Sequence, residues 1–173
     1  MLRFSILFLV LLFLLFTLEV LGPVETHVIH PFTEGLATFS TWLIRIFDDS
    51  VTTTGNAIHS SRVAWGVTIE RGCNGVEAVI ILFAAIFAFP APWKHRLLGF
   101  VAGFFAIQAL NLVRIISLFY MGQWSMVWFE WFHLYLWQAL IIIDALVVWL
   151  LWLRWISRTT PRPSGTPTAT AAA

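Results

Sequence analysis

Long apolar runs separated by polar segments divide the chain into stretches of the length that crosses a bilayer. About 20 apolar residues are needed to span the hydrocarbon core. Four stretches qualify, at 4–21, 75–92, 97–119 and 134–155. The second is short, because the helix-breaking sequence FPAPW interrupts its apolar run at Phe89. The pattern predicts about four transmembrane helices.

The first stretch has two interpretations. Arg3 stands before an apolar core, as in a secretory signal peptide. The sequence TLEVLGPVE that follows contains no convincing small-x-small cleavage site. We therefore expect an uncleaved membrane anchor.

The segment between the first two stretches, 22–72, changes its period along its length. Its first part has helical spacing, which predicts a helix lying against the membrane; the spaced residues are Leu36, Phe39, Leu43, Ile44 and Phe47. Residues 62–70 alternate with a period of two, which predicts a strand. The β-rich sequence SVTTT before Gly55 and Asn56 predicts its partner. The result is a small outer β-hairpin whose second strand leads directly to Cys73.

Two further segments complete the predicted organisation. Residues 120–132 are dense in Trp and Phe, as in an aromatic belt at lipid headgroups. The tail 157–173 is rich in Pro, Thr and Ala without an apolar period, so we expect it to be disordered and cytoplasmic. The fold class is thus an all-α integral membrane protein, with 1–156 as one polytopic domain that includes the outer helix and hairpin.

Composition supports this class. The chain is 60% hydrophobic and 11% charged, with a mean hydropathy of +0.86, so a soluble domain of 173 residues could not bury its apolar surface. A net charge of +1 gives no reason to expect nucleic acid as a partner. A single cysteine excludes an intramolecular disulfide and a Cys-rich metal site, and the scattered histidines form no H-E-x-x-H motif. We expect neither metal nor cofactor.

The basic residues orient the predicted spans, because short cytoplasmic loops collect Lys and Arg. With four spans, one side of the membrane carries six Lys and Arg residues and none of the nine acidic residues; the six are Arg3, Lys94, Arg96, Arg154, Arg158 and Arg162. The opposite side holds Glu25, Glu34, Asp48, Asp49, Glu70 and Glu130. Both termini are therefore predicted to be cytoplasmic.

Cys73 stands where the outer segment meets the second stretch. Asn74 and Glu77 have the N-x-x-E spacing of a helix N-cap and its return partner, so the helix is predicted to start at Gly75. The partial positive charge of a helix N-terminus favours a thiolate just before it. The alternative is that Cys73 is a small buried hydrophobe and that Glu77 only caps the helix.

Arg114 lies within the third stretch, where an arginine costs at least about 2.5–3.5 kcal/mol. Gln108 and Asn111 precede it in steps of three residues, so the three side chains form one slanted polar stripe on the helix. This stripe predicts a polar cavity that faces other helices. The alternative is that Arg114 snorkels to the outer headgroups.

His133 opens the fourth stretch on the outer side, which places it near the depth of Cys73 and Arg114. Glu130 in the same outer segment is a possible supporting residue, as are Asn74, Glu77, Gln108 and Asn111. Taken alone, a histidine at an interface is unremarkable, and a plain interfacial position is the simpler interpretation of His133. Asp144, deeper in the span, is interpreted as structural.

A cysteine, a histidine and an arginine together suffice to cleave an amide through a thioester. The cysteine is the nucleophile, the histidine moves protons near neutral pH, and a fixed arginine stabilises the oxyanion. The candidate catalytic residues are Cys73, Arg114 and His133.

Three sequence blocks in order also carry a family resemblance: RGCNGVEAVIILFAAIFAFPAPW, NLVRIISLFY and FEWFHLYLWQALIIIDALVVWLLW. They resemble the core of the exosortase/archaeosortase family, with the wording and short length most similar to the exosortase H type, over roughly 60–155. The resemblance places the family's catalytic cysteine, arginine and histidine at Cys73, Arg114 and His133. Archaeal relatives have an arginine at the third position, and many exosortases are longer, with about eight spans.

The resemblance implies a membrane cysteine transpeptidase or protease of the bacterial inner membrane, with its site facing the periplasm. Its partners would be exported proteins that carry a C-terminal motif, a transmembrane helix and a basic tail, together with membrane lipids. Two other classes stay open. A non-enzymatic transporter or assembly subunit with a polar pocket explains Gln108, Asn111 and Arg114 equally well, and an intramembrane metalloprotease is the weaker option.

Overall fold

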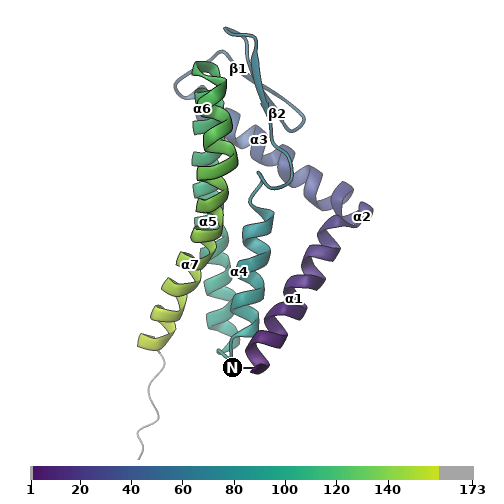
Figure 1. The fold of residues 1–173 in the computed structure, drawn as a ribbon, viewed down its shortest axis with the longest axis vertical. Coiled ribbons are helices and arrows are strands. Elements are labelled where there is room, and N and C mark those ends of the chain that lie inside the picture. The colour runs from purple at the N-terminus through teal and green to yellow at the C-terminus, as the bar shows by residue number, and fades with distance from the viewer. Residues whose placement is uncertain (1, 160–173) are drawn as a thin grey trace, which may run out of the picture.

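The computed structural model describes residues 2–159 as a helical bundle that carries a small sheet at one end (Figure 1). The bundle helices are α1 (Leu2–Val20), α4 (Val76–Ala88), α5 (Trp93–Trp124) and α7 (Trp137–Thr159). The start of α1 and the end of α7 lie at the end of the molecule opposite the sheet. Of the predicted tail 157–173, the first three residues continue α7 and the rest lies outside the described residues.

Three helices in the described part of the chain are long and apolar enough to cross a membrane: Leu2–Val20, Trp93–Trp124 and Met126–Thr159. They confirm the predicted stretches 4–21, 97–119 and 134–155 as spans by length and composition, and two of them extend further than predicted. The stretch 75–92 contains only the 13-residue α4. At 1.5 Å per residue α4 is about 20 Å long, shorter than the hydrocarbon core of about 30 Å. The predicted count of four spans is therefore not confirmed.

Helix α4 occupies the centre of the bundle, where it contacts α1, α5 and α7. Most of its residues are buried, among them Leu82 and Ile86, which are enclosed on all sides. Close packing around it depends on Gly103 of α5, where an added Cβ would lie 2.5 Å from Leu82 Cδ2 and 2.9 Å from Val148 Cγ1. One turn earlier, a Cβ at Gly99 would collide with the Trp152 indole. Small residues thus allow α5 to approach α4 and α7, as is common where helices pack in membranes.

The outer segment begins with α2 (Gly22–Val24), a π-helical turn η1 (Glu25–Ile29) and α3 (His30–Arg45). Helix α3 confirms the predicted outer helix, and its apolar residues are divided between buried and exposed sides. Leu36 and Ile44 are buried, whereas Phe39 is 47% and Phe47 89% exposed. Helix α3 buries its other face against the sheet and α5, which divides its apolar residues between two sides.

The sheet has three antiparallel strands in the order β1 (Val51–Thr54), β2 (Ala57–Ser60) and β3 (Trp65–Thr68). The predicted hairpin partners are therefore wrong, since β2 separates the two predicted strands. Gly55, at a φ of 59°, lets the chain reverse within two residues, so that Thr54 pairs with Ala57. Buried residues of the sheet form one core with those of α3 and α5: Ala37, Ile44, Val51, Ile58, Ile69, Ile115 and Phe119.

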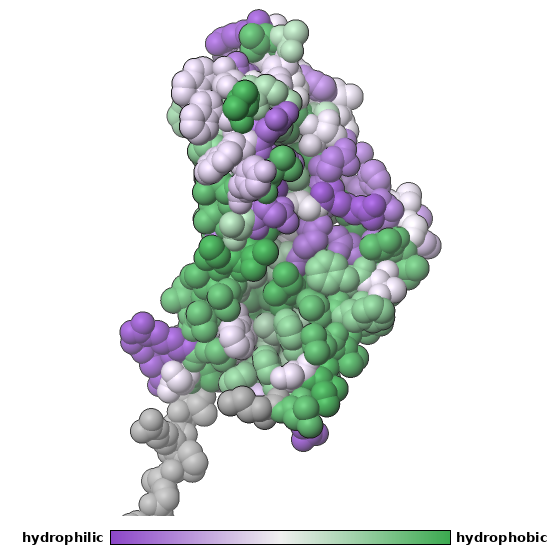
Figure 2. Space-filling view, in the orientation of Figure 1, coloured by the Kyte–Doolittle hydropathy of each residue, from purple (hydrophilic) through white to green (hydrophobic). Residues whose placement is uncertain are grey.

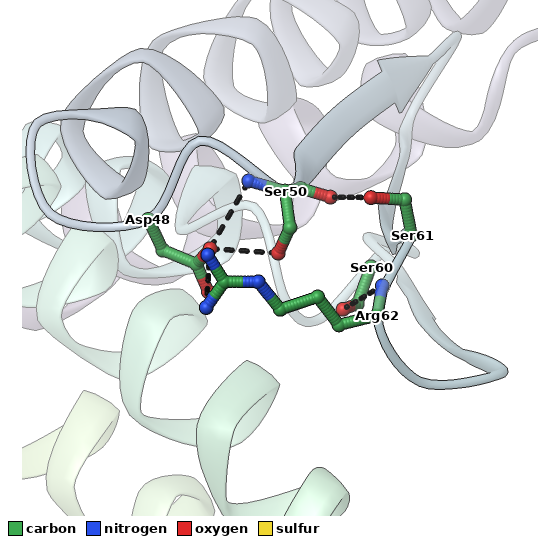
Figure 3. Close-up of polar contacts among 5 residues, drawn as sticks. All are labelled: Asp48, Ser50, Ser60, Ser61 and Arg62. Carbon is green, nitrogen blue, oxygen red and sulfur yellow. Dashed lines mark hydrogen bonds and ion pairs between the residues drawn. The ribbon is translucent and has the colours of Figure 1, made fainter.

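A polar cluster joins the loop before β1 to the loop between β2 and β3 (Figure 3). One carboxylate oxygen of Asp48 accepts hydrogen bonds from the Ser50 amide, at 3.0 Å, and the Ser50 hydroxyl, at 2.7 Å. Arg62 lies 3.6 Å from the same oxygen. The hydrogen bonds from Ser50, and then Arg62, lower the pKa of Asp48. Because Arg62 is exposed, the ion pair contributes little, and the hydrogen bonds between Ser50 and Asp48 fix the loop that leads into β1.

The surface of the bundle and the surface of the end with the sheet differ in hydropathy (Figure 2). Hydrophobic residues cover the bundle, and polar residues gather around the end with the sheet. The exposed apolar side chains include many from α1, α5 and α7, the helices that are long enough to span. Such a band of exposed apolar surface is what an integral membrane protein presents to lipid.

We predict that Gly103→Val destabilises the bundle by about 1–3 kcal/mol, because the new side chain enters space that Leu82 and Val148 fill. Ala102→Val is the matched control, since Ala102 is the exposed neighbour on the same helix. Thermal unfolding in detergent measures both. Equal unfolding temperatures for the two variants would contradict the packing described here.

Candidate active site

Cys73 lies half-buried in the short loop between β3 and α4. Its amide donates to the Glu70 carbonyl at 3.0 Å. The glycines on either side, Gly72 and Gly75, have φ values of 79° and 78°, a region that other residues seldom adopt. The sequence G-C-N-G therefore specifies a tight loop that presents the cysteine at one position.

The Gly72 residue beside Cys73 is held on both sides. Its amide donates to Glu77 Oε1 at 2.6 Å, and its carbonyl accepts from Arg114 Nη1 at 3.0 Å. The second terminal nitrogen of Arg114 lies 3.4 Å from Cys73 Sγ and donates to the sulfur. One guanidinium thus fixes the backbone of the loop and contacts its sulfur.

Arg114 reaches this loop from within α5 and is only 3% exposed. Its hydrogen bonds go to protein groups of the Cys73 loop. Snorkelling to the outer headgroups therefore does not describe this side chain. The Arg114 guanidinium is therefore held in place by its contacts with the loop that carries Cys73.

Asn74 and Glu77 organise the start of α4 differently from the predicted capping pair. The helix begins at Val76 with Gly75 as its N-cap, one residue later than predicted. Asn74 is fully buried; its Oδ1 accepts from the Val76 amide at 3.1 Å, and its Nδ2 donates to Thr33 Oγ1 at 3.1 Å. The glycine turn displaces the cap, so Glu77 bonds to Gly72 and Asn74 ties the loop to α3.

Gln108 and Asn111 share the predicted stripe with Arg114 and are buried. They lie beneath Gly75, where an added Cβ would come within 3.1 Å of Gln108 Nε2 and 3.3 Å of Asn111 Cγ. Neither lines the cavity that contains Cys73. Their place is therefore under the loop, which they support by close packing.

His133 belongs to the π-helical turn η2 (Phe132–Leu136), which joins α6 (Met126–Trp131) to α7. π-Helical turns are rare in proteins, and those that do occur are often found at functional sites. The imidazole stacks on Phe129 with centroids 5.6 Å apart and planes 6° from parallel, and Phe129 meets Trp65 edge to face. The ring is thus oriented from both α6 and β3. Glu130 is exposed and does not line the cavity.

One cavity of about 290 Å³ brings Cys73, Arg114 and His133 together. Its walls come from β3 and the two residues after it, from α5, and from α6 with η2. Cys73 and His133, which are 60 positions apart in the sequence (133 − 73), therefore line the same space. No group of three or more His, Cys, Asp or Glu side chains within 2–159 is placed to hold a metal ion.

A family model described as transmembrane exosortase (Exosortase_EpsH) matches residues 2–149. The chain belongs to the transmembrane exosortase family. No curated protein and no solved structure matches it. The family match begins at α1, so it also covers the first span and the outer segment, beyond the 60–155 region of the resemblance in the sequence.

Burial dominates the protonation of Cys73 in this exosortase-family site. It raises the pKa of the thiol, Arg114 opposes the rise, and Glu77 adds to it. The effect of burial on the thiol pKa therefore exceeds the opposing effect of the arginine. A thiol acts as a nucleophile when a base removes its proton, and the imidazole of His133 lines the same cavity as the candidate base.

Sequence patterns missed four contributors to the site: Thr33, Trp65, the Gly72 carbonyl and Phe129. Each acts through a contact with a residue far away in the chain or through the backbone. The paired glycines around Cys73 and Asn74 were the available signal, since G-C-N-G is typical of a strained turn.

We predict that alkylation of Cys73 follows a pH profile with a midpoint above the ordinary thiol value of about 8.5, because the burial that raises its pKa must be overcome. Arg114→Met should move the midpoint higher, and Glu77→Gln should move it lower. Arg114→Lys, which keeps the charge, is the control. Labelling rates with a small maleimide measure the profile, and a midpoint below 8 would contradict it.

Proposed function

We propose that this exosortase-family protein is a membrane cysteine transpeptidase that cleaves the C-terminal sorting signal of exported proteins. The observation that carries the proposal is the contact of the Arg114 guanidinium with both the Gly72 carbonyl and Cys73 Sγ, in the cavity that His133 lines. A nucleophile, a cation and a proton carrier in one cavity are the parts that acyl transfer needs.

In the first half-reaction the thiol proton of Cys73 passes to His133, and the sulfur attacks the carbonyl carbon of the scissile amide. The oxyanion forms on the carbon that the sulfur has attacked, two bonds away from the sulfur that Arg114 already contacts, so the guanidinium is close enough to stabilise it. Removing one such donor costs about 2.7–4 kcal/mol of transition-state stabilisation in a well-studied protease. The carbon–nitrogen bond then breaks, and the leaving amine takes the proton from His133.

The second half-reaction releases the thioester. An acceptor amine attacks the carbonyl carbon and gives its proton to His133, and the Cys73 sulfur leaves and recovers that proton. Water in place of the amine would give hydrolysis by the same steps. The exported protein is thereby separated from its C-terminal helix and joined to the acceptor.

The proposed location is the bacterial inner membrane, with both termini in the cytoplasm and the site facing the periplasm. The site lies towards the end with the sheet, away from the start of α1 and the end of α7. The basic residues Arg3, Lys94 and Arg154 favour that opposite end as the cytoplasmic one. Exported proteins with a motif, a transmembrane helix and a basic tail are the substrates that the family resemblance implies.

The non-enzymatic alternative needs a pocket around the polar stripe. The space lined by Asn111, Arg114 and Asp144 has a volume of about 10 Å³, which is at the limit for a single water molecule. Gln108 packs under the loop and does not line it. Of the two cavities that Arg114 lines, the larger is the one with the cysteine, and this favours the enzyme over a solute pocket.

We predict that Cys73→Ala abolishes loss of the C-terminal helix from a co-expressed candidate substrate, while the protein stays in the membrane. Cys73→Ser should be nearly inactive, because a hydroxyl is a weaker nucleophile. Arg114→Lys should lower cleavage by about 100-fold or more, since lysine loses the two-pronged contact with Gly72 and the sulfur. Immunoblots at matched protein level measure all three. Full activity of Cys73→Ala would end the proposal.

The proposed sidedness makes a separate prediction. A reporter fused after Arg158 should report a cytoplasmic location, and one inserted in the β-turn at Gly55 should report a periplasmic one. A pair of reporters that is active only on one side each, such as an alkaline phosphatase and a fluorescent protein, makes the measurement. The reverse pattern would place Cys73 and His133 on the cytoplasmic side and contradict the proposed substrate access.

A further inference from the structure

We propose that β3 is the substrate-binding strand, and that the extended segment next to the scissile bond joins its free edge as a fourth strand. The inference rests on the proposed function and adds the way in which the substrate is held. Recognition would be made chiefly through main-chain hydrogen bonds to β3, the mode by which many proteins add a peptide to an exposed sheet edge.

The first observation is the continuity of the cavity wall. Six consecutive residues, 65–70, line the cavity that contains Cys73. Successive side chains of a strand point to opposite faces. A cavity that touches every residue in succession therefore lies along the edge of the strand, where the backbone is presented.

The second observation is that this edge has no strand partner. Within the described residues β3 pairs with β2 alone, and it is the last strand in the order β1-β2-β3. An open edge presents unpaired N–H and C=O groups and is usually covered. The opposite edge of the sheet, at β1, contacts α3, and the Thr53 hydroxyl donates to the Ala37 carbonyl there.

The pairing register shows which groups the edge offers. The Ile69 amide donates to the Asn56 carbonyl at 3.0 Å, so Ile69 faces β2. Antiparallel ladders alternate, so Val67 also faces β2, and the N–H and C=O groups of Gly66 and Thr68 point to the cavity side. Both residues are exposed. Two donors and two acceptors thus stand at the spacing that an extended peptide matches.

The third observation ties this edge to the nucleophile. Both main-chain groups of Ile69 bond to Asn56. The Ile69 amide donates to the Asn56 carbonyl, and the Ile69 carbonyl accepts from Asn56 Nδ2 at 2.9 Å. Four residues later Cys73 lies in the loop that Arg114 and Glu77 fix. A peptide paired with β3 is therefore in a set register with the sulfur. Because the pairing uses the main chain, the enzyme would accept varied side chains at the paired positions.

Thr68→Pro tests the strand directly. Proline removes the Thr68 N–H that points to the cavity and leaves the bonds of Val67 and Ile69 to β2 intact; edge positions of this kind tolerate proline. We expect cleavage of a co-expressed candidate substrate to fall at least 10-fold. Thr68→Val is the matched comparison, since it loses the hydroxyl but keeps the N–H, and it should cleave at least 10-fold faster than Thr68→Pro. Cys73 alkylation should stay within twofold in both variants.

A proline scan of the substrate, read with the wild-type enzyme, does not depend on the folding of any variant. Proline placed in turn at each position beside the scissile bond should inhibit cleavage with a period of two. The inference is overturned if Thr68→Pro cleaves normally, if Thr68→Val is as slow as Thr68→Pro, or if the scan shows no alternation. If Thr68→Pro loses Cys73 alkylation, the scan alone decides. Absence of cleavage by the wild type, with every candidate substrate, would instead overturn the proposed function, and the role of β3 with it.

Discussion

The guanidinium of Arg114 holds the site together. A buried arginine is expensive in a membrane protein unless its donors are satisfied. Here one nitrogen bonds to the Gly72 carbonyl and another to Cys73 Sγ, while Glu77 accepts from the amide of the same glycine. The cation, the loop and the carboxylate therefore stabilise one another. Loss of any of them leaves a buried polar group without its partner, which typically costs about 1–3 kcal/mol and more for a charged group.

The surrounding fold follows from where this contact must be made. Helix α4 is too short to cross the hydrocarbon core, and it begins well below the far end of α5 (Figure 1). The sheet fills the space above it, so β3 can run directly into the Cys73 loop beside α5. The tight return at Ser125 then brings α6 and η2 back along α5, which adds His133 to the same cavity. A full-length α4 would leave no room for this arrangement.

The sequence predicted the parts of this structure that depend on composition and local period. Continuous apolar runs identified α1, α5 and α7, and the outer helix α3 has helical spacing. The depth of Cys73, Arg114 and His133 followed from counting spans, and the structure places them on one cavity. These inferences need only the rise of a helix and the side on which each segment emerges.

The remainder depends on contacts between distant residues, which periodicity does not report. The strand β2 was missed because its four residues follow a two-residue turn and carry little apolar pattern. The helical spacing of Leu36 and Phe39 did not show that Leu36 is buried and Phe39 exposed. Gln108 and Asn111 were expected to share a polar cavity with Arg114; Gly75 packs against both of them, and of the two only Asn111 lines a small space with Arg114. All three features depend on tertiary contacts, which the local spacing of residues does not report.

The most direct measurement of the central claim is the detection of the acyl-enzyme. A purified candidate substrate is incubated with the enzyme in detergent and quenched in acid, and the enzyme is analysed by intact and peptide mass spectrometry. The account predicts that the N-terminal part of the substrate is attached to Cys73 through a bond that hydroxylamine cleaves, and that Cys73→Ala shows no adduct. Cleaved substrate without any adduct on Cys73, or cleavage that persists in Cys73→Ala, would contradict it.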